Sequence, residues 1–331
     1  MADASTGRPY RRGPMRNVWP STARPLSHRA ARKADASYGA SDTPNWRDVN
    51  WPAHTHQVEV NGRSINYVDI GEGSQTIVFI HGLGGSWQNW LENLPRTAEH
   101  CRAIALDLPG FGLSEMPADP ISITGFAATV DSFCDSLGLG PVVLVGNSMG
   151  GFTAAEVAIQ HPKRVELLVL VDSAGISSAN VTNSRPGQTL ARQLMMRGQG
   201  DPNAAKKMLT RPGYIALGMG LVARYPTRIS KELLSEQLLT FGDSGFGDAF
   251  EAILAYDFRH RLEEIGCPVL VIQGEDDILV PLGDALEFCE LIPNAELLTM
   301  ADTGHVPMFE RPAQFNDALL AFVAAPTAPT S

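Results

Sequence analysis

The sequence predicts an α/β protein built on a doubly wound, mostly parallel sheet. Short β-branched apolar runs recur along the chain, and stretches with helical spacing separate them. Uninterrupted apolar runs of this kind are typical of strands covered on both faces, and their alternation with helices favours parallel strands. The 331 residues are 44% hydrophobic and 19% charged, which is enough apolar content for one large core.

An antiparallel hairpin is expected where folding begins, which we place near Thr55. Residues 56–60 alternate between polar and apolar side chains, and residues 64–70 alternate again. Between them, Asn61 and Gly62 suit a two-residue type I′ turn. These signals predict a hairpin at one edge of the sheet.

The core strands and helices follow in order. Apolar runs predict strands over 76–80, 103–106, 142–145, 167–171 and 269–272. Helical spacing predicts helices over 123–137, 151–160 and 312–323.

The alternation stops between residues 171 and 268, where a helical insertion over the sheet is expected. Helical spacing covers 189–196, 204–209 and 231–239. Four of the ten methionines fall here, namely Met195, Met196, Met208 and Met219. Flexible thioethers suit either an adaptable apolar pocket or ordinary helix packing, and both interpretations stay open. The predicted division is a basic extension, a core in two parts, a cap and a tail: 1–54, 55–175 with 257–325, 176–256 and 326–331.

Charge and cysteine usage limit the partners. Residues 1–33 contain eight basic residues and one acid, so we expect a solvated extension, with contact to an anionic surface or partner as the alternative. The net charge of -10 gives no reason to expect nucleic acid, and no run of about 18 apolar residues predicts a membrane span. The widely spaced cysteines lack metal-ligand spacing and fit packing roles in a reducing, cytoplasmic compartment: Cys101, Cys134, Cys267 and Cys289.

A nucleophile is predicted at Ser148. The run 146–150 reads G-x-S-x-G, follows the strand 142–145 and precedes a helix. Such a turn holds serine in a strained backbone conformation above the sheet edge, and small residues two positions away avoid a collision. The adjoining helix N-terminus adds free N–H groups beside the hydroxyl.

A serine hydroxyl needs a base to take its proton, and the base needs an acceptor to orient it. Of eight histidines, His305 is the candidate because it lies in a loop after the apolar run 297–300. Asp276 and Asp277 come soon after the strand 269–272 and supply the acceptor.

From these motifs, the chain resembles the α/β-hydrolase family with a helical cap over about residues 57–323. The resemblance also covers the segments 107–114 and 304–312. It implies an eight-stranded, mostly parallel sheet and the catalytic order Ser148, Asp277, His305.

The family's acid usually lies in a G-x-x-D turn with a proline four residues later. Gly274, Asp277 and Pro281 satisfy both spacings, which favours Asp277 over Asp276. Some members carry the acid after the preceding strand, which here would be Asp172.

The resemblance also assigns supporting roles. An oxyanion requires preorganised donors, and the Met149 N–H directly after the serine is one. The segment 81–85 matches the family's oxyanion loop and implies the Leu83 N–H as the second. In the family the histidine at this position generally braces the loop, so the resemblance implies that role for His81 rather than that of a second base. Glu310 is expected to anchor the histidine loop, and Asp107 is expected to bond backbone groups in its own turn.

Serine at the elbow counts against dehalogenases and epoxide hydrolases, which carry aspartate there. The run 146–151 resembles hydrolases that cleave carbon–carbon bonds of aromatic ring-fission products, but those enzymes commonly place tryptophan where this chain has Val306. We therefore expect hydrolysis of small to medium apolar carboxylic esters, with carbon–carbon hydrolysis of an apolar ketone second. A ligand-binding protein on the same scaffold and an acyltransferase are further alternatives. No metal or cofactor is expected, no stable membrane insertion is expected, and a homodimer is possible.

Overall fold

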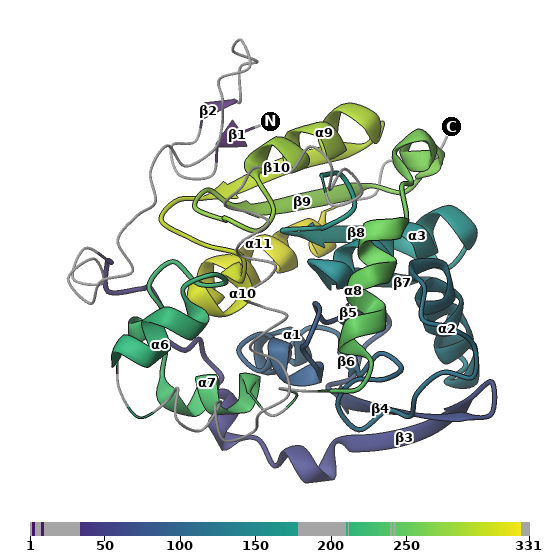
Figure 1. Cartoon of the computed structure of the whole chain (residues 1–331), viewed down its shortest axis with the longest axis horizontal. Helices are drawn as coiled ribbons and strands as arrows, with labels where there is room; N and C mark the ends of the chain where they lie inside the picture. Colours follow the sequence, from purple (N-terminus) through teal and green to yellow (C-terminus); the bar gives the residue numbers. More distant parts are fainter. Residues whose placement is uncertain are drawn as a thin grey trace.

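The computed structural model describes residues 2–3, 8–9, 34–177, 210, 212–238, 240 and 243–325 (Figure 1). Its centre is a mostly parallel sheet of eight strands, as predicted. In order across the sheet these are β10 (Ala295–Met300), β9 (Val269–Gly274), β8 (Val165–Val171), β7 (Val142–Asn147), β5 (Thr76–Ile80), β6 (Arg102–Leu106), β4 (Arg63–Ile70) and β3 (Thr55–Val60). β4 pairs antiparallel with both of its neighbours, β3 and β6, and the other pairs in this sheet are parallel.

Strand register brings the candidate residues to one edge of the sheet. Ile80 of β5 lies beside Gly146 of β7, and Asn147 lies beside Val171 of β8. Val171 in turn lies beside Ile272 of β9. The loops that leave these parallel strands therefore emerge side by side, which is where α/β folds place their sites.

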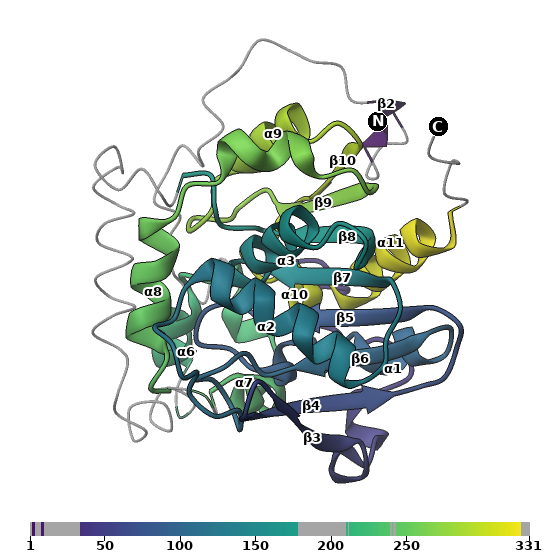
Figure 2. The ribbon, with the colours of Figure 1, turned by 90° about the vertical axis from the view of Figure 1, so that its right-hand side faces the viewer.

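Helices cover both faces of the sheet (Figure 2). One face packs against α2 (Ile123–Ser136), α3 (Met149–Gln160) and α9 (Leu282–Leu291), and the other against α1 (Leu94–Ala98) and α11 (Pro312–Ala324). Strand side chains alternate between the two cores: in β7, Val142 and Leu144 join the first, and Val143 and Val145 join the second. This burial on both faces explains why the strands are apolar without interruption.

Local sequence signals explain two element ends, of which the turn at Asn61 and Gly62 was predicted. Asn61 and Gly62 both have positive φ, 53° and 74°, as the type I′ turn between β3 and β4 requires. The Ser122 side chain accepts a hydrogen bond from the Gly125 N–H and caps α2.

The insertion contributes helices beyond the carboxyl edge of the sheet (Figures 1 and 2). Its described elements, with the segment after it, are α6 (Pro212–Met219), η6 (Pro226–Arg228), α7 (Lys231–Gln237), α8 (Phe246–Ala255) and η7 (Arg259–Glu264). The predicted helix over 231–239 corresponds to α7, whereas those over 189–196 and 204–209 lie outside the described residues. Of the four methionines there, Met219 is described and packs against the second core. No helix within the described ranges is long and apolar enough to cross a membrane.

The start of the folded chain differs from the expectation. Residues 34–54, predicted to belong to an extension, pack against the core and contain η2 (Trp46–Asp48) and η3 (Trp51–Ala53). Tyr38 is 1% exposed, and the Trp46 ring nitrogen donates to Glu92 at 2.9 Å. Isolated aromatic anchors hold this segment, so it lacks the periodicity by which strands and helices are predicted. Further upstream, β1 (Ala2–Asp3) pairs antiparallel with β2 (Arg8–Pro9).

The four cysteines are unpaired packing residues. Burial raises the pKa of Cys267 to about 11 and those of Cys134 and Cys289 to about 12, and the pKa of Cys101 is also raised. Thiols of this kind stay protonated near neutral pH and are weak ligands and nucleophiles.

Candidate active site

Ser148 lies on a strained turn between β7 and α3. Its backbone has φ 55° and ψ -117°, a conformation that residues other than glycine rarely adopt. The Ser148 N–H donates to Val171 O at 2.9 Å, and its carbonyl accepts from Phe152 and Ala174, both at 3.1 Å. These hydrogen bonds of the Ser148 N–H and carbonyl hold the turn and place the residue directly before the N-terminus of α3.

Glycine is required two positions on either side. A Cβ on Gly146 would lie 2.2 Å from Gly150 O, and a Cβ on Gly150 would lie 2.2 Å from Ile80 O. Backbone atoms cause both collisions, so no side-chain movement relieves them. The steric reason predicted for G-x-S-x-G is confirmed.

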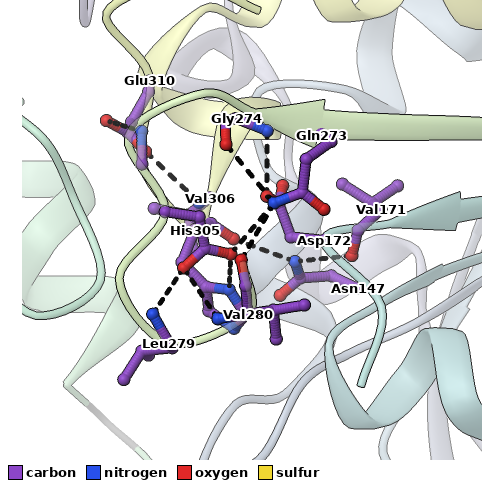
Figure 3. Close-up of polar contacts among 12 residues, drawn as sticks. Asn147, Val171, Asp172, Gln273, Gly274, Leu279, Val280, His305, Val306 and Glu310 are labelled. Carbon is purple, nitrogen blue, oxygen red and sulfur yellow. Dashed lines mark hydrogen bonds and ion pairs between the residues drawn. The ribbon is translucent and has the colours of Figure 1, made fainter. Parts of the chain in front are cut away.

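His305 and Asp277 form a buried hydrogen-bonded pair. His305 Nδ1 lies 2.6 Å from Asp277 Oδ2, and the two residues are 6% and 1% exposed. The other oxygen, Asp277 Oδ1, accepts from the N–H groups of Leu279 at 2.8 Å and Val280 at 3.1 Å (Figure 3). The carboxylate is therefore fixed in orientation, with Oδ2 directed at the imidazole.

The loop that carries His305 is held by its neighbours. The Asn147 side-chain amide donates to His305 O at 3.1 Å, and the His305 N–H donates to Val222 O at 2.8 Å. A Cβ on Gly274 would lie 2.0 Å from Gly304 O, so glycine lets this loop rest directly on the end of β9. The histidine thus has supports from β7, β9 and the insertion.

Glu310, in α10 (Pro307–Glu310), anchors the same loop, as predicted. It is fully buried and accepts hydrogen bonds from the N–H groups of Gly304 at 2.9 Å and Val306 at 3.2 Å. It also accepts from the Arg224 N–H at 2.7 Å and from the Tyr38 hydroxyl. Burial raises the pKa of Glu310, although these hydrogen bonds act in the opposite direction.

The three candidate acids have different bonding partners. Asp276 forms an ion pair with Arg224, with Nε and Oδ2 3.1 Å apart. Asp172 accepts hydrogen bonds from Gln273 and Gly274. Among the described residues, Asp277 is the acid hydrogen-bonded to His305.

Asp172, Asp277 and His305 also form the one group of described side chains whose atoms come close enough together for a metal site. Two ligands of a tetrahedral zinc ion, each about 2.1 Å from the metal, would lie about 3.4 Å apart. The Nδ1 and Oδ2 atoms at 2.6 Å are closer than that and share a hydrogen bond. The donors present therefore fit a proton relay better than a metal.

The predicted oxyanion loop lies beside Ser148. A Cβ on Gly82 would approach the Ser148 Cβ to 3.3 Å, and Leu83 is the next residue. Met149 begins α3, where the first N–H groups lack intrahelical partners. The Leu83 N–H donates no hydrogen bond within the described part of the chain. Both groups could therefore donate to a bound oxyanion.

His81 and Asp107 brace the loops around this edge, as expected. The Leu108 N–H donates to His81 Nε2 at 3.0 Å, and the other ring nitrogen lies 2.7 Å from Gly82 O. Burial lowers the pKa of His81 to about 4, which keeps this ring neutral. Asp107 accepts from the Leu113 N–H in its own turn at 3.0 Å and also from the Trp87 N–H at 2.7 Å.

Two supports of the site were not predicted. Tyr38 lies in the segment taken as an extension, and no pattern there points to Glu310. Val222 reaches His305 from the insertion through its backbone, which leaves no side-chain signal. The position before the serine did carry a signal, since Asn147 belongs to the run on which the resemblance rests.

Comparison with known proteins agrees with this geometry. Residues 75–312 match the model of the alpha/beta hydrolase fold family. The chain belongs to the α/β-hydrolase family. The fold and the enzyme class expected from the sequence are thereby confirmed.

The relatives differ in their reactions. This α/β hydrolase is 34% identical over 271 residues to a 2-hydroxy-6-oxononadienedioate/2-hydroxy-6-oxononatrienedioate hydrolase of Paraburkholderia phymatum, covering 78% of this chain and 90% of the relative. It is 31% identical over 275 residues to the dihydrolipoyllysine-residue acetyltransferase component of the acetoin cleaving system of Pseudomonas putida, covering 81% and 68%. A solved N-acyl homoserine lactone degrading enzyme superposes with TM-score 0.65 at 28% identity, covering 81% of this chain and all of that one.

Proposed function

We propose that this α/β hydrolase cleaves carboxylic esters of small to medium apolar substrates through an acyl-enzyme intermediate. Ser148 is the nucleophile, His305 the general base and acid, and Asp277 the group that orients the imidazole. The 2.6 Å contact between Asp277 and His305, with the adjoining loop bonded to the residue before Ser148, carries this proposal. The lactone-degrading structural neighbour supports it, because opening a lactone is hydrolysis of an ester.

The reaction has two halves that use the same groups. His305 takes the Ser148 hydroxyl proton through Nε2 while Asp277 accepts from Nδ1 and stabilises the cation. Serine attacks the carbonyl, and the Leu83 and Met149 N–H groups stabilise the oxyanion, each contributing about 3 kcal/mol. His305 then protonates the leaving alcohol. Water attacks the acyl-enzyme with His305 as base, and the acid is released with the serine restored.

Carbon–carbon hydrolysis is the second candidate. The Paraburkholderia phymatum relative, named as a hydrolase of a ring-fission product, favours it. Val306 stands where such enzymes commonly have tryptophan, which keeps ester hydrolysis first.

Acyl transfer to an acceptor other than water is the third candidate. The Pseudomonas putida relative is named as an acetyltransferase component, and this chain spans 68% of that protein. In this case an alcohol, amine or thiol would replace water in the second half of the reaction.

A single substrate panel distinguishes these candidates. Purified enzyme is given p-nitrophenyl esters of graded acyl length and, separately, a 2-hydroxy-6-oxo-dienoate. Products are analysed with and without competing alcohol, amine and thiol acceptors. Ester turnover with free acid as the main product supports the proposal. Failure on every ester with rapid loss of the dienoate would reverse the ranking, and acylated acceptor as the main product would favour transfer.

If the chain is a ligand-binding protein on this scaffold, no substrate of the panel should be turned over. Slow or absent labelling by a fluorophosphonate probe would support that alternative. Fast labelling would show that the serine is activated and that the panel lacks the right substrate.

A further inference from the structure

Asp172 is a buried acid to which the proposed mechanism gives no role. It follows β8, is 0% exposed and has φ 42°, a second strained residue at the same sheet edge as Ser148. Its N–H donates to Ile272 O at 2.9 Å. Figure 3 shows its side chain between those of Gln273 and Asn147, close to the His305 loop.

The two carboxyl oxygens of Asp172 have different surroundings. Oδ1 accepts from Gln273 Nε2 at 2.8 Å and from the Gly274 N–H at 2.9 Å. Oδ2 is inaccessible to solvent and accepts no hydrogen bond from any described residue. Polar atoms of Asp172, Asp277 and His305 lie within 4.8 Å of one another. A buried oxygen that receives no hydrogen bond from the described residues and lies next to a second carboxylate is explained if that oxygen carries a proton.

Electrostatics favour the same state. Burial and the neighbouring charge of Asp277 raise the pKa of Asp172 well above its usual range. Glu310 adds a further negative charge near Asp172. Burial raises the pKa of Asp284 in α9, and the charge of Asp277 also raises it. His305 is the titratable base in the cluster, and its Nδ1 is bonded to Asp277. Two adjacent buried carboxylates are not both ionised at low cost.

We propose that Asp172 is a positioning residue: it is neutral, and its Oδ2–H donates a hydrogen bond to the Asp277 carboxylate. The inference rests on the proposed function, because it concerns how Asp277 acts on His305. The pair then carries one negative charge. When His305 takes the serine proton, that charge balances the imidazolium, and no net charge is left in the relay.

The hydrogen bond from Asp172 to Asp277 also affects the pH range in which His305 can act as a base. A hydrogen bond to Asp277 withdraws negative charge from the oxygen that faces Nδ1, which weakens the stabilisation of the imidazolium. Neutral imidazole, the form needed to deprotonate Ser148, is then present at lower pH. An ionised Asp172 would have the opposite effect.

Two substitutions distinguish a neutral Asp172 from an ionised one. Asp172→Asn keeps a neutral side chain, an oxygen for Gln273 and Gly274 and an N–H donor for Asp277, and asparagine tolerates positive φ. Glycine also adopts positive φ without strain, so Asp172→Gly keeps this backbone conformation but removes the hydrogen-bond donor to Asp277. The pH dependence of kcat/KM on a p-nitrophenyl ester is measured for both variants and the wild type, and circular dichroism checks that each variant is folded.

The proposal predicts that Asp172→Asn leaves the midpoint of the acidic limb within about 0.3 pH unit of the wild type, whereas Asp172→Gly moves it upward by about 0.5 pH unit. An ionised Asp172 predicts a downward shift of about one pH unit or more in both variants, because each loses a negative charge near the imidazole. A downward shift in Asp172→Asn would overturn the proposal.

An infrared difference spectrum, wild type minus Asp172→Asn at neutral pH, supplies a readout that needs no turnover. A protonated carboxyl band in the wild type is expected. If the band is present but no ester is cleaved, the proposed function fails while the proton assignment stands. If the only difference is an ionised carboxylate band, the inference about Asp172 is wrong whatever the enzyme hydrolyses.

Discussion

The Asn147 side chain bonds the backbone of His305: its amide nitrogen lies 3.1 Å from His305 O and 3.2 Å from Val171 O. The residue before Ser148 therefore holds the loop of the predicted base. Asn147 thus connects the end of β7, next to Ser148, to the loop of His305 through a buried amide.

We expect Asn147→Ala to lower kcat about tenfold, the effect of losing about 1.4 kcal/mol of positioning energy, with a smaller change in KM. Asn316→Ala is the matched control, because it also removes a buried amide that bonds a main-chain oxygen, that of Glu92. The control should lower the free energy of unfolding but leave kcat near the wild-type value. Equal kcat in both variants would show that the bond to His305 has no role in positioning.

Tyr38 connects the N-terminal segment to the histidine loop. Tyr38→Phe removes the donor to Glu310 and the acceptor of the Tyr225 N–H, so we expect a loss of about 1–3 kcal/mol in the free energy of unfolding and a several-fold fall in kcat. Tyr256→Phe removes a comparable Tyr–Glu bond, to Glu156 at 2.9 Å. Chemical denaturation and ester kinetics on both variants test this, and a fall in kcat of the same size in the control would contradict the proposed link.

Gly274→Ala tests whether contact between the acid turn and the histidine loop sets the site. The new Cβ would lie 2.0 Å from Gly304 O, so the loop must move, and a displacement near 1 Å is expected to lower kcat/KM about a hundredfold. Gly266→Ala, shortly before the same strand, meets nothing within 4 Å and serves as the control. Wild-type kinetics in Gly274→Ala would mean that the loop position is not critical.

Asp284 gives a pH dependence of stability. Burial raises its pKa from 3.8 to about 6, so the folded protein holds this proton where the unfolded chain has released it. The contribution of Asp284 to the free energy of unfolding is fully present below about pH 4 and is lost as the pH rises through 6. The stability of Asp284→Asn relative to wild type should therefore increase by about 2.4 kcal/mol between pH 4 and pH 7.

Urea unfolding at several pH values measures this difference. Asp248→Asn, which changes an exposed carboxylate, should give a nearly constant difference from wild type over the same range. A constant difference for Asp284→Asn as well would contradict a raised pKa at that position.

Much of this fold could be predicted because its strands are buried on both faces. Continuous apolar runs such as 76–80 and 142–145 indicate parallel strands directly. The glycines of G-x-S-x-G meet a steric requirement that can be recognised from the sequence. The acid turn was predicted from its resemblance to the family's G-x-x-D turn, and the structure gives the reason for the glycine, since Gly274 contacts Gly304 closely.

Other features depend on contacts that leave no local pattern. Tyr38 meets Glu310 across most of the chain, and a single buried aromatic residue among polar neighbours does not indicate a folded segment. Asp172 could be predicted only as an alternative acid. Its neutral state depends on where Asp277 and Gln273 lie in space, which sequence spacing does not determine.

The central claim is that His305, oriented by Asp277, activates Ser148. The most direct test is fluorophosphonate labelling followed by peptide mass spectrometry, with ester turnover measured in parallel on wild type and folded Ser148→Ala. We predict one adduct, on Ser148, and loss of nearly all turnover and labelling in the variant. Turnover in Ser148→Ala equal to that of the wild type, or an adduct on another residue that accounts for the activity, would contradict the account.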